Sequence, residues 1–166
     1  MKNNKKLIYY TIFIILLVSS VIYFYPKKLS IEYSGIMYRL GDSNYSENIK
    51  VSVNGYLSKG LIKGDKFQGI LTIGDKQLSK ISIRFDNAGK GDLLYFDENT
   101  GDFTSYGQTY SSYMKEGLTI SVFEQYGQKE GMRRWSSKDG LMISAPANNR
   151  NEALDISNKL MKGILN

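Results

Sequence analysis

The densest group of residues that could do chemistry is the segment 97–102, which reads Asp-Glu-Asn-Thr-Gly-Asp. An EF-hand calcium loop needs oxygen ligands at positions 1, 3 and 5, glycine at position 6 and glutamate at position 12. Counted from Asp97, Gly101 takes the fifth position and Asp102 the sixth, so the calcium pattern fails. We therefore expect a polar turn between two strands, because Asp, Asn and Gly tolerate unusual backbone angles.

Paired carboxylates could also serve a hydrolase, since glycosidases hold two acids roughly 5 to 10 Å apart across the bond they cleave. Asp97, Asp102 and Glu124 are candidates for such a pair. Glu124 lies in phase with Leu118 and Ile120 and could point inward with them. We favour the other interpretation, in which the strand emerges into solvent and Glu124 with it.

The chain has no cysteine and no histidine. These absences exclude disulfides, ordinary zinc, iron–sulfur and copper sites, and nucleophilic catalysis of the Ser-His-Asp or Cys-His type. We expect no metal and no cofactor.

Two segments have the composition of binding surfaces. Residues 104–113 are rich in Tyr, Ser and Gly, which binding loops favour. Residues 133–135 combine two arginines with the only tryptophan, a pairing that suits cation–π and ionic contacts. For both segments packing against the sheet is the favoured alternative, with the arginines solvated. The candidate ligand-binding residues are Tyr106, Tyr110, Tyr113, Arg134 and Trp135.

Residues 7–25 carry no charge and are flanked by lysines. At a rise of about 1.5 Å per residue this segment reaches about 28 Å, close to the hydrocarbon thickness of a bilayer. Tyrosines lie near both ends, and Pro26 ends the segment before Lys27 and Lys28. We expect residues 1–6 to be a short tail, 7–25 a transmembrane helix that contacts the lipid bilayer, 26–29 a linker and 30–166 the domain. A cleaved signal peptide is the alternative, but Tyr-Phe-Tyr-Pro is a poor cleavage site.

The positive charge belongs mainly to this segment and its flanks. Removing the five lysines of residues 1–28 from the 22 basic residues leaves 17 against 16 acidic residues. A nearly neutral domain is not expected to bind nucleic acid. We expect the N-terminus in the cytoplasm and the domain outside, with the reversed topology as the alternative. The composition, rich in Lys, Asn, Ile and Tyr, is typical of a bacterium with a low-GC genome, so we expect a bacterial plasma membrane.

The domain is expected to be mainly β. Alternating segments recur about every ten residues between turns rich in Gly, Asp and Asn, which predicts an antiparallel sandwich or barrel, with α+β as the alternative. The predicted strands are 30–40, 47–57, 67–73, 78–85, 93–96, 103–106, 117–126, 131–136 and 141–145.

The C-terminal segment 150–165 is predicted to be an amphipathic helix. Asn149 can cap it, and Glu152 follows three residues later as in a capping box. Ala153, Ile156 and Leu160 recur at helical spacing, so the apolar face is expected to pack on the sheet.

The sequence predicts a single-pass membrane-anchored protein with a non-enzymatic extracytoplasmic module that binds a protein or a cell-envelope polymer, or that supports an assembly. A carboxylate-dependent cell-envelope hydrolase is the alternative.

Overall fold

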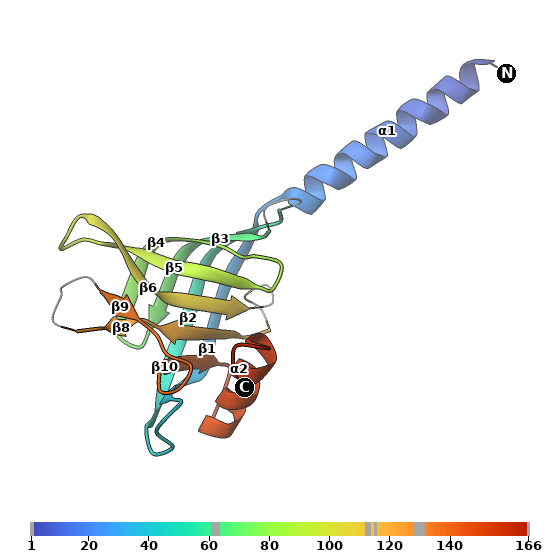
Figure 1. Ribbon diagram of the computed structural model, residues 1–166. Helices are drawn as coiled ribbons and strands as arrows, with labels where there is room; N and C mark the ends of the chain where they lie inside the picture. Colours follow the sequence, from blue (N-terminus) through green and yellow to red (C-terminus); the bar gives the residue numbers. More distant parts are fainter. Residues whose placement is uncertain (1, 61–63, 112–113, 115, 128–131, 166) are drawn as a thin grey trace.

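The computed structural model describes residues 2–60, 64–111, 114, 116–127 and 132–165. In these ranges the chain begins with helix α1 (Lys2–Phe24) and ends with helix α2 (Arg150–Leu160), with all strands between them (Figure 1). The strands are β1 (Lys27–Arg39), β2 (Ser46–Ser58), β3 (Lys66–Ile73), β4 (Lys76–Arg84), β5 (Lys90–Asp97), β6 (Asp102–Ser111), β7 (Leu118–Val122), β8 (Glu124–Gln125), β9 (Arg133–Arg134) and β10 (Leu141–Ala145).

Eight of these strands form a closed antiparallel barrel in the order β1-β2-β3-β4-β5-β6-β7-β10, and β10 pairs back onto β1. Strands β8 and β9 form a separate hairpin between β7 and β10. Closure pairs β1 with β10, the two strands that would otherwise be sheet edges open to pairing with another chain. The prediction of a mainly β, barrel-like domain is confirmed, with the closed barrel realised rather than the sandwich.

The barrel interior is filled by alternate side chains of its strands. Ile81, Ile83 and Phe85 point inward and Ser82 and Arg84 outward, as the alternation predicted. A barrel of eight strands is just narrow enough for side chains to fill it. The interior cluster also contains Leu29, Val51, Val53, Leu57, Phe67, Leu71, Ile73, Leu78, Leu93, Tyr95, Met114, Leu118, Ile120, Val122, Ile143 and Ala145.

Helix α2 packs on the outside of the barrel against β1, β7 and β10 and buries a second cluster there. Its N-terminus is capped as predicted, because Glu152 N donates to Asn149 Oδ1 at 3.0 Å. The Glu152 carboxylate in turn accepts from Asn148 N at 2.9 Å. The helix ends at Leu160 rather than at residue 165, and Gly163 then turns the chain with φ +79.

Helix α1 projects away from the barrel (Figure 1). Its window Lys6–Phe24 is 0% buried and is long and apolar enough to cross a membrane, properties that a signal sequence shares. The predicted linker 26–29 is shorter than expected, because Lys27 already pairs with Leu57 in the sheet. Only Tyr25 and Pro26 therefore separate α1 from β1.

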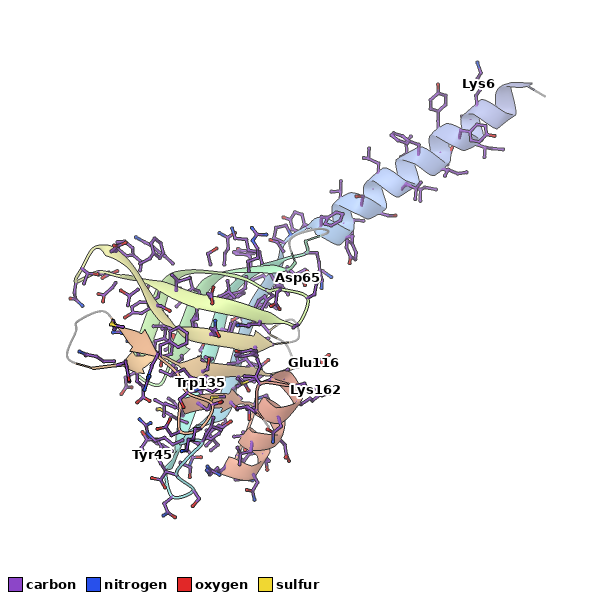
Figure 2. The ribbon with its side chains drawn as sticks, in the orientation of Figure 1. Lys6, Tyr45, Asp65, Glu116, Trp135 and Lys162 are labelled. Carbon is purple, nitrogen blue, oxygen red and sulfur yellow. The ribbon has the colours of Figure 1, made fainter. Side chains whose placement is uncertain are left out.

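The two ends of the barrel differ in their distance from α1. We call the end that holds the start of β1 and the β2–β3 loop the proximal end; Figure 2 shows Asp65 of that loop beside the base of α1. The opposite end, which we call the distal end, holds the β1–β2, β3–β4 and β5–β6 turns and the β8–β9 hairpin. Tyr45 of the β1–β2 turn lies at that end (Figure 2).

Candidate functional site

The acidic segment 97–102 forms the turn between β5 and β6, as predicted. Asp97 Oδ1 accepts from the backbone N of Asn99 at 3.0 Å, and Gly101 N donates to the Asp97 carbonyl at 2.8 Å. Asp102 Oδ1 accepts from Phe103 N at 2.7 Å. These carboxylates therefore hold the turn, and no three acids in the described part of the chain gather at a metal-binding distance.

Glu124 lies on β8 and is half-exposed, with its carboxylate bound to the Arg39 guanidinium. Arg39 also donates to the carbonyl of Asp139 at 3.2 Å, and its guanidinium lies 5.8 Å from the ring centroid of Tyr45. The hydrogen bond that Arg39 donates to the Glu124 carboxylate raises the pKa of Arg39. This contact ties β8 to the end of β1, so Glu124 neither points into the core nor stands free in solvent.

Tyr106 lies on β6, within the predicted strand 103–106, and the strand continues beyond that prediction to Ser111. Its ring packs against the interior cluster at the distal end, edge-on to Tyr95 with 6.4 Å between centroids. Lys76 Nζ lies 5.0 Å from the Tyr95 centroid and 5.2 Å from the Tyr106 centroid, and donates to Tyr95 Oη at 3.5 Å. Burial, with a smaller contribution from Tyr95, raises the pKa of Tyr106, so its hydroxyl remains a proton donor.

The other two candidate tyrosines are placed differently. Tyr110 is 3% exposed and belongs to the cluster beneath α2, with its hydroxyl donating to Gln108 Oε1 at 3.2 Å. Burial raises the pKa of Tyr110 as well. Tyr113 lies outside the described residues. Of the two candidate tyrosines that the structure describes, Tyr106 lies at the distal end and Tyr110 beneath α2.

Arg134 is the last residue of β9, and Trp135 follows it directly. The Arg134 guanidinium carbon lies 3.1 Å from the ring centroid of Tyr126, while Arg133 Nη1 donates to the carbonyl of Ser105 at 3.2 Å. Trp135 is half-buried and packs against the cluster under α2. Its indole lies so close to Gly140 that a Cβ there would be 2.3 Å from Nε1.

The β5–β6 and β8–β9 hairpins enclose a surface groove of about 580 Å³. Beside it stand exposed apolar side chains: Phe103 is 55% exposed, Tyr126 45% and Met132 54%. We call this surface the distal rim. It consists of Lys76, Asp97, Thr100, Phe103, Thr104, Ser105, Tyr106, Phe123, Gln125, Tyr126, Met132, Arg133 and Arg134. The buried ring of Tyr95 supports it from the barrel interior.

In the distal rim, cationic side chains lie over aromatic rings, and two of these cations form no ion pair with a described residue. Lys76 forms no ion pair with any described carboxylate, and the same holds for Arg134. Cations above aromatic rings, next to exposed phenyl and phenol groups, are the anchors that protein interfaces favour. Such a surface can hold an extended peptide or stack on a sugar ring.

No family model matches the chain, and no curated protein or solved structure is similar to it. The site therefore rests on its own geometry.

Sequence reasoning missed Lys76, Tyr95 and Phe103. Tyr95 belongs to a short apolar strand and Lys76 to a Gly-Asp-Lys turn, and nothing in either segment predicts that they meet. Only Phe103 could have been predicted to be exposed. It follows a tight polar turn, where few neighbouring strands can cover an aromatic side chain.

Proposed function

We propose that this chain is a single-pass membrane protein whose barrel is a non-enzymatic binding module outside the cytoplasm. In this proposal α1 anchors the barrel in the lipid bilayer, and the distal rim binds a protein or a polymer of the cell envelope. Tethering confines the barrel to a thin layer and raises its effective concentration for partners there.

One observation carries the proposal. Residues 6–24 of α1 are exposed and none of them belongs to the described barrel core, whereas the barrel interior is packed with its own side chains. An apolar helix without a protein partner is stable in lipid and costly in water. Because side chains fill the barrel interior, we expect a ligand to bind on the outer surface.

The distal rim supports the binding role by its position. It lies at the end of the barrel away from α1 (Figure 1), so a membrane that holds α1 would leave it uncovered. The hydrolase alternative has weaker support, because Asp97 and Asp102 are used by their own turn and Glu124 by Arg39.

Cell fractionation tests the anchor and its topology together. We expect the full-length chain to sediment with membranes, to resist alkaline carbonate and to be released by detergent. Intact mass should show that the N-terminal helix is retained. Protease added to spheroplasts should degrade the barrel; degradation only after lysis would establish the reversed topology instead.

Photo-crosslinking in cells tests the rim. A benzoylphenylalanine at Phe103 should give adducts of higher mass, because this side chain is exposed at the rim. The same group at Lys159, on the exposed side of α2, is the matched control. Equal crosslinking at both positions, or none at Phe103, would contradict a binding role for the distal rim.

A further inference from the structure

The short connection between α1 and β1 fixes where the barrel can lie. Only Tyr25 and Pro26 intervene, so three Cα–Cα steps of about 3.8 Å limit Lys27 to about 11 Å from the end of the helix. The headgroup layer on each side of a bilayer is about 5 to 7 Å thick. If α1 spans the bilayer, the proximal end of the barrel must therefore lie against the headgroups.

The register of the first four strands gathers basic and aromatic side chains at this end. Lys28 pairs with Tyr56, and Lys66 pairs with Arg84. All four point outward, because their neighbours Leu57, Phe67 and Ile83 fill the interior. We call Lys28, Tyr56, Lys66 and Arg84 the proximal patch; Tyr56 is 54% exposed.

Asp65 and Asp86, the acids next to the proximal patch in sequence, already have hydrogen-bond partners. Asp65 bonds to Lys59 at 2.7 Å and accepts from Gly60 N at 3.2 Å. Asp86 Oδ1 accepts from Ala88 N and Lys90 N, both at 2.9 Å. None of Lys28, Lys66 and Arg84 forms an ion pair within the described residues. Their charge is therefore open to an external anion.

We propose that the proximal patch binds the headgroups of anionic phospholipids, so that the barrel rests on the bilayer and the distal rim points away from it. Lysine and arginine within a Debye length of an anionic surface are attracted to it, and tyrosine is favoured at the interface. The proposal rests on the membrane anchor proposed above. It does not depend on which side of the membrane holds the barrel.

Spin labels on the full-length chain in nanodiscs test this contact, and the absence of native cysteine makes single labels clean. Gln68→Cys reports the proximal patch, because Gln68 is exposed and pairs with Tyr56. Glu98→Cys reports the distal end, and Ile14→Cys reports α1. In discs with anionic lipid, a nickel chelate on lipid headgroups should relax the Gln68 label strongly and leave the Glu98 label unaffected.

Two variants distinguish attraction of the proximal patch to anionic headgroups from the effect of the short link to α1. About ten Gly-Ser residues inserted between Pro26 and Lys27 give the barrel a flexible tether. With this insertion the Gln68 label should stay near the headgroups of anionic discs and leave those of neutral discs. Adding Lys28→Glu, Lys66→Glu and Arg84→Glu should reduce the signal in anionic discs to the level in neutral discs, while circular dichroism confirms the fold.

The labels distinguish the ways in which the proposal can fail. An Ile14 label that oxygen dissolved in the bilayer does not reach would overturn the anchor, and the patch with it. An Ile14 label in the bilayer, with a Gln68 signal from the flexibly tethered chain that does not depend on lipid charge, would overturn the patch alone.

Discussion

At the residue scale, the polar side chains under α2 form a connected set between barrel and helix. Thr119 Oγ1 and Ser144 Oγ lie 2.9 Å apart, and Ser144 Oγ lies 3.3 Å from Tyr38 Oη. Tyr38 also donates to the carbonyl of Ala153 at 3.4 Å. Burial raises the pKa of Tyr38, so it remains a donor. Buried polar groups need such partners, and these bonds fix how α2 sits.

Tyr38→Phe should lower the free energy of unfolding by about 0.5 to 1.5 kcal/mol, the usual net value of one hydrogen bond. Ser144 keeps Thr119 as a partner, which limits the loss. Tyr56→Phe is the control, because its ring is 54% exposed. Urea denaturation measures both; an equal loss in the two variants would contradict a role for the hydroxyl of Tyr38.

Glu152→Gln should change how stability depends on pH. The backbone N–H of Asn148 holds the pKa of Glu152 below its ordinary value of 4.5, with further bonds from the Asn148 and Asn149 amides. A lowered pKa means that the folded protein favours the ionised form, so the stabilisation is present above pH 4.5 and is lost as pH falls through the folded pKa.

Urea denaturation of both proteins between neutral and acidic pH measures this effect. The difference between wild type and Glu152→Gln should be largest at neutral pH and should shrink in acid. A difference that is constant with pH would contradict the assignment.

At the element scale, β6 depends on one irregularity. Leu93 pairs with Gly107 and Leu94 with Ser105, so Tyr106 is an extra residue in its strand. This bulge is the local feature that lets Tyr106 lie against the interior cluster at the distal end. The Tyr/Ser-rich segment is thus a paired strand. Tyr106 packs on its inner face and Tyr110 on its outer face, and aromatic residues are favoured in such a sheet.

Gly107→Ala should destabilise the barrel severely. Gly107 has φ +158, and a Cβ there would lie 2.0 Å from the carbonyl oxygen of Ser121. Gly101→Ala is the matched control, because it also has positive φ but nothing within 4 Å of its Cβ position. The control should cost about 1 to 2 kcal/mol. Thermal unfolding would contradict this expectation if the two variants melted together.

Asn149→Ala should lower the free energy of unfolding by about 0.5 to 2 kcal/mol, because the first turn of α2 loses its cap. The bond from Glu152 N to Asn149 Oδ1 is the one removed. Asn158→Ala, on the exposed side of the same helix, should change stability little. A loss as large for Asn158 as for Asn149 would show that general helix content, not the cap, is measured.

At the scale of the whole molecule, the two hydrophobic clusters of the described residues are built by the barrel and α2. The interior cluster and the cluster under α2 draw on residues after Lys28, and none comes from α1. The molecule is thus a folded barrel with an apolar helix at one end.

Deleting residues 1–26 should therefore leave a folded barrel that no longer sediments with membranes. Its far-ultraviolet circular dichroism should remain dominated by strands, and its melting should stay cooperative. The same measurements on the full chain in detergent provide the reference. An aggregated or unfolded product would show that α1 contributes to the fold.

The sequence by itself determined the features that depend on local periodicity. Uncharged residues 7–25 predict an apolar helix, alternation predicts strands such as 78–85, and Asn149 with Glu152 predicts the start of α2. Each rests on neighbours in the chain, where side-chain period and capping decide the backbone.

Only the tertiary structure decided that the barrel closes and which residues meet at its two ends. Closure depends on β10 meeting β1, and the distal rim on Lys76 meeting Tyr106; both pairs are far apart in sequence. The direct entry of Lys27 into the sheet follows from its pairing with Leu57. Such contacts arise from strand register, and a single strand does not encode the register of its partner.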